Sequence, residues 1–289
     1  MTVAAAVSEA IEILVRAGFS RDEARRDTGV LGRALLGWDA ARWYAHQADD
    51  LATQTHHELL AGARRRATHE PVAYITGERE FYGRSFLVTR DVLIPRPETE
   101  LIVETALELV PHGARSTGES VDIVDVGTGS GCLAITLACE WPRARIVASD
   151  TSADALSIAV QNATRLGVQD RIAFVCASLA GDVSEACDLL VSNPPYVRRI
   201  DRDALAVDVR DHEPDAALYG GDDGLQVIEA LVPAALRALR PNGLLLMEIG
   251  YQQADDVQGL IAGSGLQWIE TRRDLNGIPR VVVARRKVL

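Results

Sequence analysis

The sequence predicts an α/β fold in which a mostly parallel sheet is covered by helices on both faces, with a small helical-bundle domain before it. Two observations predict this architecture. From residue 122 onward, short apolar runs that suit strands alternate with longer stretches that keep helical spacing, and this alternation is typical of parallel sheets. Before residue 68, helical spacing is present and the alternation typical of strands is nearly absent.

Helices account for the N-terminal part of the chain. Val7, Ile11 and Leu14 keep a helical spacing, and residues 50–66 form another amphipathic stretch. Breaks that contain glycine separate these stretches and suit tight loops between short helices. We therefore assign residues 1–72 to a helical domain. Its functional interpretation is substrate docking, and the alternative is a purely structural role.

A β-hairpin linker is expected next, over residues 73–95. Its strands are predicted at Tyr74–Ile75 and at residues 86–88, around turns at Gly77 and Gly83. Aromatic and β-branched residues next to glycine turns are the usual signal for such a hairpin.

The remaining residues, 96–289, are predicted to form the α/β domain, which begins with a helix over residues 98–109. Strands are predicted at residues 122–126, 145–148, 172–176, 188–191 and 243–249. Helices are predicted at residues 131–139, 154–166, 224–239 and 252–262. Two final strand-like runs, 266–271 and 280–284, flank a turn at Asn276–Gly277 and are expected to pair antiparallel.

Composition narrows the class of protein. A chain of 289 residues with 47% hydrophobic residues can bury a sizeable core. The net charge of -11 and the sequence pI of about 5.1 weigh against a nucleic-acid partner, because nucleic-acid domains usually carry a basic face. No apolar run approaches a membrane span, and the first residues do not resemble a secretion signal. We therefore expect a soluble, cytoplasmic protein.

Metal and hydrolase chemistry have little support in the sequence. The chain has no C-x-x-C pair and no clustered histidines, so its four cysteines are interpreted as reduced thiols and no metal site is predicted. These cysteines are Cys132, Cys139, Cys176 and Cys187. A G-x-S-x-G motif is also absent, so a hydrolase nucleophile is not indicated.

A glycine-rich loop is the first candidate binding feature. The stretch "VDIVDVGTGSGCLAI" places Gly127, Gly129 and Gly131 between a buried strand and a helix, where a backbone without side chains lets a ligand come close. The next strand ends in Asp150, which suits acceptance of bonds from ribose hydroxyls. Together they predict an adenosine-containing cofactor. The G-x-G-x-G spacing favours one without a pyrophosphate bridge.

The stretch "LLVSNPPYVRR" is the second candidate feature. Pro194 and Pro195 cannot continue a strand ladder, so the strand must stop at Asn193 in a rigid turn. Ligands of open α/β sheets bind beyond the carboxyl ends of the strands, which places this turn on the same rim as the glycine loop. Ordinary packing is an equal alternative for Tyr196 alone, whose ring could also stack on a planar substrate group.

The turn suits methyl transfer to a planar NH₂ group. The side-chain carbonyl of Asn193 and the backbone carbonyl of Pro194 can together accept both hydrogens of such a group. They would hold the nitrogen in line with an electrophilic methyl group and stabilise the positive charge that develops on it. Adenine, cytosine, guanine and glutamine side chains all qualify as the NH₂ donor on this chemistry alone.

The wider sequence resembles the class I S-adenosylmethionine-dependent methyltransferases, whose mostly parallel seven-stranded, Rossmann-like sheet ends in an antiparallel strand. Within this class it is similar to the HemK/PrmC family of N5-glutamine methyltransferases that act on peptide chain release factors. The resemblance covers residues 70–289, while the N-terminal helices match only in type. The motifs that carry it are "EPVAYITGEREFYGRSFLVTRDVLIPRPETE", "DVGTGSGCLAI", "VSNPPYV", "DHEPDAALYGGDDGL" and "DLNGIPRVVVARR".

The resemblance implies methyl transfer from S-adenosylmethionine, which leaves S-adenosylhomocysteine, to the glutamine of the Gly-Gly-Gln motif of bacterial release factors. It implies that the ribose is bound by Asp150 and the adenine, at a departure from the family pattern, by Ser178. It implies that the remaining cofactor-binding residues are Gly127, Thr128, Gly129, Ser130 and Gly131, which hold the methionine end, together with Asn193. It implies that the substrate is bound by Asn193, Pro194, Pro195, Tyr196, Arg96 and Pro97, with Asn193 and Pro194 as the catalytic residues.

Several alternatives remain at this point. A sister group modifies glutamine in a large-subunit ribosomal protein, although the Pro-Glu-Thr-Glu continuation is more similar to the release-factor branch. A DNA or RNA amino-methyltransferase is disfavoured by the net charge and by the absence of a basic insertion. A non-enzymatic interaction module is disfavoured because the loop, Asp150 and Asn193 are all present. A monomer without direct nucleic-acid contact is expected.

Overall fold

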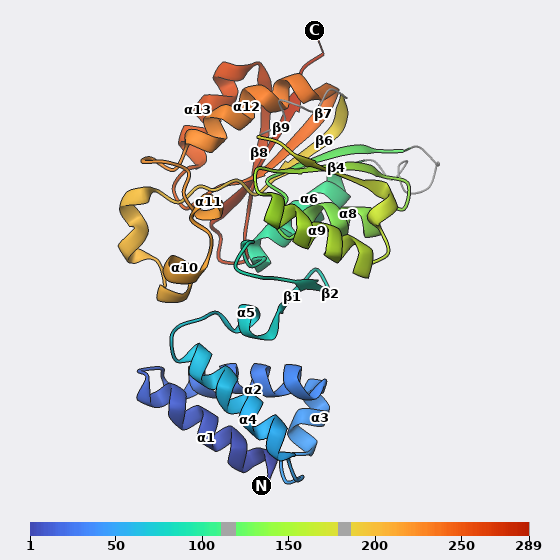
Figure 1. The fold of residues 1–289 in the computed structure, drawn as a ribbon. Helices are drawn as coiled ribbons and strands as arrows, with labels where there is room; N and C mark the ends of the chain where they lie inside the picture. The colour runs from blue at the N-terminus through green and yellow to red at the C-terminus, as the bar shows by residue number, and fades with distance from the viewer. Residues whose placement is uncertain (111–119, 179–185, 289) are drawn as a thin grey trace. The chain divides into compact units, whose positions relative to one another are not determined.

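The computed structural model describes residues 1–110, 120–178 and 186–288, which form two compact units (Figure 1). The first unit consists of Met1–Glu78 with Ala206–His212. The second consists of Arg79–Leu205 with Glu213–Leu289. The first is helical and the second carries the large sheet, as the sequence predicts for the two ends of the chain.

Short helices form the first unit: α1 (Val3–Arg16), α2 (Arg21–Leu36), α3 (Ala40–Ala45), α4 (Thr53–Arg66), α5 (Val72–Thr76) and α10 (Val207–His212). Ser20 begins α2 with a capping box, in which its hydroxyl accepts from the Glu23 amide while the Glu23 carboxylate accepts from the Ser20 amide. Small and aliphatic side chains of α1, α2 and α4 form its core. The Arg66 guanidinium joins this core to α10 through Asp208, 3.8 Å away.

The strand predicted at Tyr74–Ile75 is wrong, because these residues lie in α5. Pro71 begins a helical turn, and its carbonyl accepts from the amides of Tyr74 and Ile75 at 3.0 and 3.1 Å. Gly77, with a φ of 78°, ends the helix. Tyr74 is buried and Ile75 packs against the helical core. Packing against helices therefore decided the conformation of a pair whose residue types favour strands.

The observed hairpin consists of β1 (Glu78–Phe81) and β2 (Arg84–Leu87). Its apolar pair, Phe81 and Phe86, contacts edge to face and belongs to the core beneath the large sheet. Asn162 joins the end of the hairpin to the glycine loop. Its side chain accepts from the Leu87 amide at 2.7 Å and donates to the carbonyls of Leu87 and Ser130.

The second unit contains a seven-stranded sheet of order β5-β4-β3-β6-β7-β9-β8. The strands are β3 (Asp122–Val126), β4 (Arg145–Asp150), β5 (Ile172–Cys176), β6 (Cys187–Ser192), β7 (Leu239–Glu248), β8 (Leu266–Arg273) and β9 (Pro279–Arg286). β3 pairs in parallel with β4 and β6, and β9 runs antiparallel to both of its neighbours. All seven strands predicted for this domain are observed at their expected places in the sequence, and the final pair is antiparallel as predicted.

Helices cover both faces of this sheet (Figure 1). They are α6 (Glu100–Leu109), α8 (Cys132–Glu140), α9 (Ala153–Arg165), α12 (Gln226–Ala238) and α13 (Ala254–Ser264). Successive strand residues point to opposite faces, so Ile123 packs with α6, α8 and α9 while Val124 packs with α12 and α13. This two-sided burial explains why the strands are rich in apolar residues.

Short helices that the sequence analysis did not anticipate complete the described chain. They are η1 (Pro97–Thr99), η2 (Gln169–Arg171), η4 (Arg199–Ala204) and α11 (Asp215–Leu218), in addition to α10. Each is six residues or fewer, too short to show a helical period. β7 also begins four residues before the predicted strand, with an irregular register opposite Cys187–Leu189.

Two glycines of α2 allow a matched test of packing in the helical unit. A Cβ added at Gly32 would lie 2.2 Å from the Trp43 ring, whereas one at Gly29 would lie 3.8 Å from its nearest neighbour. We expect Gly32→Ala to lower the free energy of unfolding by about 1–3 kcal/mol through overpacking. Gly29→Ala should raise it by up to about 1 kcal/mol through helix propensity. Urea unfolding followed by far-UV circular dichroism measures both, and equal effects would contradict the packing argument.

Candidate active site

The glycine loop lies between β3 and α8, at the carboxyl edge of the sheet. Amides of Gly127 and Thr128 both donate to the Ser149 carbonyl of β4 at 2.9 Å, which holds the loop against the neighbouring strand. Gly127, Thr128, Gly129 and Ser130 all line a cavity at this edge. The loop thus presents backbone where the sequence predicts a cofactor.

Gly131 has a different task from the rest of the loop. It precedes α8 with a φ of 83°, and a Cβ there would lie 2.6 Å from the Ile135 side chain and 3.2 Å from the Ala159 Cβ. The residue does not line the cavity. The structure therefore places it in the packing of α8 against α9, behind the cofactor-binding surface that the resemblance implies.

Asp150 ends β4 and lines the cavity. One carboxylate oxygen accepts from the Gly129 amide and the other from the Ser152 amide, each at 2.9 Å. Both oxygens keep further lone pairs for ligand hydroxyls. The carboxylate thus orients the loop at the same time as it faces the cavity, a second role that the sequence analysis did not predict.

Asp125 lies beneath the loop and is fully buried. Its Oδ2 accepts from the Thr128 hydroxyl at 2.7 Å and from the Ala134 amide at 3.1 Å. Among the described residues, no hydrogen-bond partner reaches its Oδ1. Burial raises the pKa of Asp125 to about 7, against these two hydrogen bonds, and the charge of Asp150 adds to the rise.

The Asn-Pro-Pro-Tyr turn follows β6 on the same edge of the sheet. Asn193, Pro194 and Pro195 line the cavity. The Asn193 Nδ2 donates to the Thr99 hydroxyl at 3.0 Å. Tyr196 lies outside the lining: its ring packs against the core shared with α12 and α13, and its hydroxyl donates to Glu248 at 2.9 Å.

The segment after α11 supports this turn from behind. A Cβ at Gly220 would lie 2.5 Å from the Pro195 carbonyl oxygen, so only glycine allows this approach. The Gln253 side-chain amide donates to the carbonyls of Tyr196 and Gly224 at 3.1 and 3.2 Å. The "YGGDDG" stretch therefore packs against the turn and supports it. This stretch is part of the family resemblance, which assigned it no role.

Arg96 and Pro97, predicted to bind substrate, are not among the lining residues. The Arg96 guanidinium forms an ion pair with Glu213 at 2.5 Å, and the Glu213 carboxylate also accepts from the Ile94 amide at 3.3 Å. Glu213 is 5% exposed. This pair ties the "IPRP" segment to the residues that follow Glu213, and both segments contribute walls of the cavity through Pro95 and Pro214.

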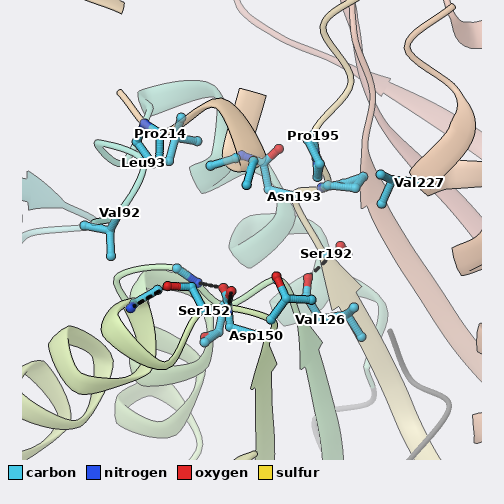
Figure 2. Close-up of a pocket in the computed structure, with 18 of the residues that line it drawn as sticks. Val92, Leu93, Val126, Asp150, Ser152, Ser192, Asn193, Pro195, Pro214 and Val227 are labelled. Atoms are coloured by element: carbon cyan, nitrogen blue, oxygen red, sulfur yellow. Dashed lines mark hydrogen bonds between the residues drawn. The ribbon is translucent and has the colours of Figure 1, made fainter. Parts of the chain in front are cut away.

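The cavity measures about 440 Å³ and lies wholly within the second unit. Figure 2 shows Asp150 and Ser152 on one side of it and Asn193 and Pro195 on another, from the ends of different strands. Ser178 also lines it. Sequence reasoning missed several lining residues, most of them apolar, which carry no chemical signal. Among them are Thr99, Val92, Leu93, Ser152, Pro214, Ala216, Ala217, Gln226, Val227 and Ala230.

No metal site is evident in the described part of the chain, and the cysteine at the cavity does not carry a reactive thiolate. No group of three or more His, Cys, Asp or Glu side chains is placed there to hold a metal ion. Cys132 lines the cavity, and burial raises the pKa of its thiol to about 12, so it stays neutral. No helix in the described ranges is long and apolar enough to cross a membrane.

A glycine loop and an acid on adjacent parallel strands, beside an Asn-Pro-Pro-Tyr turn on this strand order, define a class I S-adenosylmethionine-dependent methyltransferase. A family model described as methyltransferase small domain matches residues 105–209, and the PrmC N-terminal domain model matches residues 5–77. The ribosomal protein L11 methylase from Lactobacillus delbrueckii subsp. bulgaricus shares the fold, with a TM-score of 0.50 and 22% identity over 70% of this chain and 84% of that chain.

Curated relatives identify the family. The release factor glutamine methyltransferase of Nitratidesulfovibrio vulgaris is 46% identical over 80% of this chain and 77% of its own. That of Cereibacter sphaeroides is 41% identical over 99% of both chains. The chain therefore belongs to the HemK/PrmC family of release factor glutamine methyltransferases, whose methyl donor is S-adenosylmethionine.

The buried Asp125 carboxyl predicts a specific pH dependence of stability. Its pKa rises from an ordinary 3.8 to about 7 in the folded protein, so the folded state binds more protons than the unfolded state between these values. Stability contributed by this group must then fall as the pH rises from about 4 to 7. Asp125→Asn keeps an acceptor for Thr128 and Ala134 and does not titrate.

Between pH 5 and pH 8 we expect the wild type to lose about 3 kcal/mol of unfolding free energy relative to Asp125→Asn, because about two pH units below the raised pKa contribute about 1.4 kcal/mol each. Urea midpoints of both proteins at pH 5 and pH 8 measure the difference. A constant difference in unfolding free energy would contradict the raised pKa.

Proposed function

We propose that this protein transfers the methyl group of S-adenosylmethionine to the side-chain amide nitrogen of the glutamine in the Gly-Gly-Gln motif of a peptide chain release factor. The observation that carries the proposal is the position of Asn193 on the cavity that the glycine loop and Asp150 also line. The curated relatives, named release factor glutamine methyltransferases, support the choice of glutamine over a nucleic-acid base.

The cavity fits the donor. The loop exposes backbone at Gly127 and Gly129, where φ is positive and no Cβ narrows the space. Asp150 offers carboxylate lone pairs to ribose hydroxyls, and Ser178 lines the same cavity for the adenine. When bound there, S-adenosylmethionine supplies an electrophilic methyl group on a positively charged sulfur. We assign these residues to cofactor binding.

Asn193 and Pro194 act on the substrate nitrogen. An amide nitrogen is a weak nucleophile because its lone pair is delocalised into the carbonyl group. The Asn193 Oδ1 and the Pro194 carbonyl each accept one of its hydrogens, so the nitrogen is held in line with the methyl carbon. As the N–C bond forms and the S–C bond breaks, these two oxygens stabilise the positive charge on nitrogen. One proton then leaves to water, and S-adenosylhomocysteine is the other product.

The remaining assignments follow from this activity. The helical unit, whose exposed apolar side chains include Val30, Leu35 and Tyr44, is the proposed docking module for the release factor. A net charge of -11 supports a protein substrate without direct nucleic-acid contact. We further propose that the protein acts as a monomer in the cytoplasm, where translation takes place.

The direct test is a methylation assay with a release factor that carries an unmodified motif. We expect mass spectrometry of the motif peptide to show one added methyl group on the glutamine. A release factor with glutamate in place of that glutamine is the matched control. Methylation of a ribosomal protein or of an oligonucleotide, with none on the release factor, would overturn the proposal in favour of the other amide or exocyclic-amine substrates.

Asp150→Ala should weaken S-adenosylmethionine binding by about 10- to 100-fold, since hydrogen bonds to a charged acceptor contribute about 1.5–3 kcal/mol each. Asp154→Ala is the control, because this acid lies exposed in the first turn of α9 and outside the cavity. Isothermal titration calorimetry with the cofactor measures both. Equal dissociation constants for the two variants would argue against ribose binding by Asp150.

Asn193→Ala should lower kcat by about 100- to 1000-fold, as expected when an electrostatic partner of the transition state is removed. Its affinity for S-adenosylmethionine should stay within about threefold, because the loop and Asp150 are intact. Asn276→Ala, in the exposed turn between β8 and β9, is the control. A folded Asn193→Ala protein with wild-type kcat would refute the role of this amide.

A further inference from the structure

A chain of buried hydrogen bonds leads away from Asn193 to β7. Asn193 Nδ2 donates to the Thr99 hydroxyl at 3.0 Å, and that hydroxyl donates to Glu248 Oε2 at 2.6 Å. The Tyr196 hydroxyl donates to the other carboxylate oxygen of Glu248 at 2.9 Å. Thr99 and Glu248 are each only 1% exposed, so water does not compete for these bonds.

The polarity of this chain is set at Glu248. An ionised carboxylate only accepts hydrogen bonds, so both hydroxyls must point their hydrogens at it. The Thr99 hydroxyl has a single hydrogen, and once this is donated to Glu248 the oxygen can only accept from Asn193. The Asn193 amide must therefore turn its NH₂ to Thr99, which leaves its carbonyl oxygen for the cavity.

Three groups around Glu248 supply partners for a carboxylate: the hydroxyls of Thr99 and Tyr196, which both donate to it, and the guanidinium of Arg280. Burial is the largest effect and leaves the pKa of Glu248 above its ordinary value, while the hydrogen bonds from Thr99 and Tyr196 and the positive charge of Arg280 limit the rise. Arg280 is itself held by Asp274 at 3.0 Å. Buried charges persist where such partners satisfy them.

The orientation of the amide matters for an NH₂ substrate. The two ends of an asparagine amide have nearly the same shape and differ in hydrogen-bond character, so sterics alone do not choose between them. A carbonyl in the cavity accepts from a substrate NH₂ group. An NH₂ in the same place would meet it donor to donor and would leave the transition-state charge without a partner.

We propose that Thr99 and Glu248 are positioning residues that fix the Asn193 side-chain carbonyl toward the substrate nitrogen. This inference rests on the proposed function and names residues that do not themselves accept the substrate hydrogens. Glu248 lies at the end of β7, and Thr99 lies at the junction of η1 and α6, where it also borders the cavity. Thr99 is therefore the residue of the "PETE" stretch that binds the Asn-Pro-Pro-Tyr turn, through the Asn193 side chain.

The test compares two variants of Thr99 with a matched control. Thr99→Val keeps the shape and removes the hydroxyl, while Thr99→Ser keeps the hydroxyl. Thr105→Val makes the same chemical change at another buried threonine of α6, whose hydroxyl donates to the Leu101 carbonyl within the helix. We expect Thr99→Val to lower kcat about 10- to 100-fold, as for other residues that orient a catalytic group.

The same experiment separates positioning from packing. Thr99→Ser should retain most of the wild-type kcat, and Thr105→Val should have the wild-type kcat. Binding of S-adenosylmethionine by Thr99→Val, measured by calorimetry, should stay within about threefold of the wild type. Equal losses in Thr99→Val and Thr99→Ser, or wild-type kcat in a folded Thr99→Val protein, would overturn the inference.

A double-mutant cycle tests whether Thr99 acts through Asn193. In the Asn193→Ala background the amide that Thr99 orients is gone, so adding Thr99→Val should change kcat by less than about threefold. If the two substitutions instead lower kcat independently, so that their fold-losses multiply, Thr99 acts by another route and the inference is overturned. A wild-type enzyme that leaves the release factor unmethylated would instead refute the proposed function, so the two failures are distinguishable.

Discussion

At the carboxyl edge of the parallel sheet, two aspartates accept hydrogen bonds that hold the glycine loop and the helices after it in place. Asp125 accepts from the loop and from the start of α8, and Asp150 accepts from Gly129 and from the residue before α9. Without these acceptors the Gly129 and Ala134 amides and the Thr128 hydroxyl would lose their partners, at considerable cost where they are buried. The shape of the cavity depends on this pairing, since the loop forms one of its walls.

The opposite wall depends on rigidity of a different origin. Pro194 and Pro195 fix the turn through their rings, and the backbone of the "YGGDDG" segment packs so closely that Gly220 admits no side chain. The Gln253 side chain holds the Tyr196 carbonyl from behind. A reaction that relies on holding a weak nucleophile in line benefits from such a turn, because small displacements of a reacting atom are costly.

Much of the fold was predictable from periodicity. The strands and helices of the second unit lie within a few residues of their predicted places, because each shows a clear apolar pattern that burial on two faces requires. The strand predicted at Tyr74–Ile75 is wrong because the residue types favour a strand, whereas the surrounding segments are helices. Short helices such as α10 and α11 escaped prediction because they span less than two turns.

The sequence by itself determined the chemistry of the site: a glycine loop, an acid at the next strand end, and a rigid turn with two carbonyl acceptors. Only the tertiary structure decided which of these groups face the cavity and how their side chains are oriented there. Arg96 pairs with Glu213, and Asn193 meets a threonine 94 residues away in the chain. Such contacts leave no periodic pattern, because they arise where separate segments meet. The direction in which the Asn193 amide points is therefore a property of the folded protein.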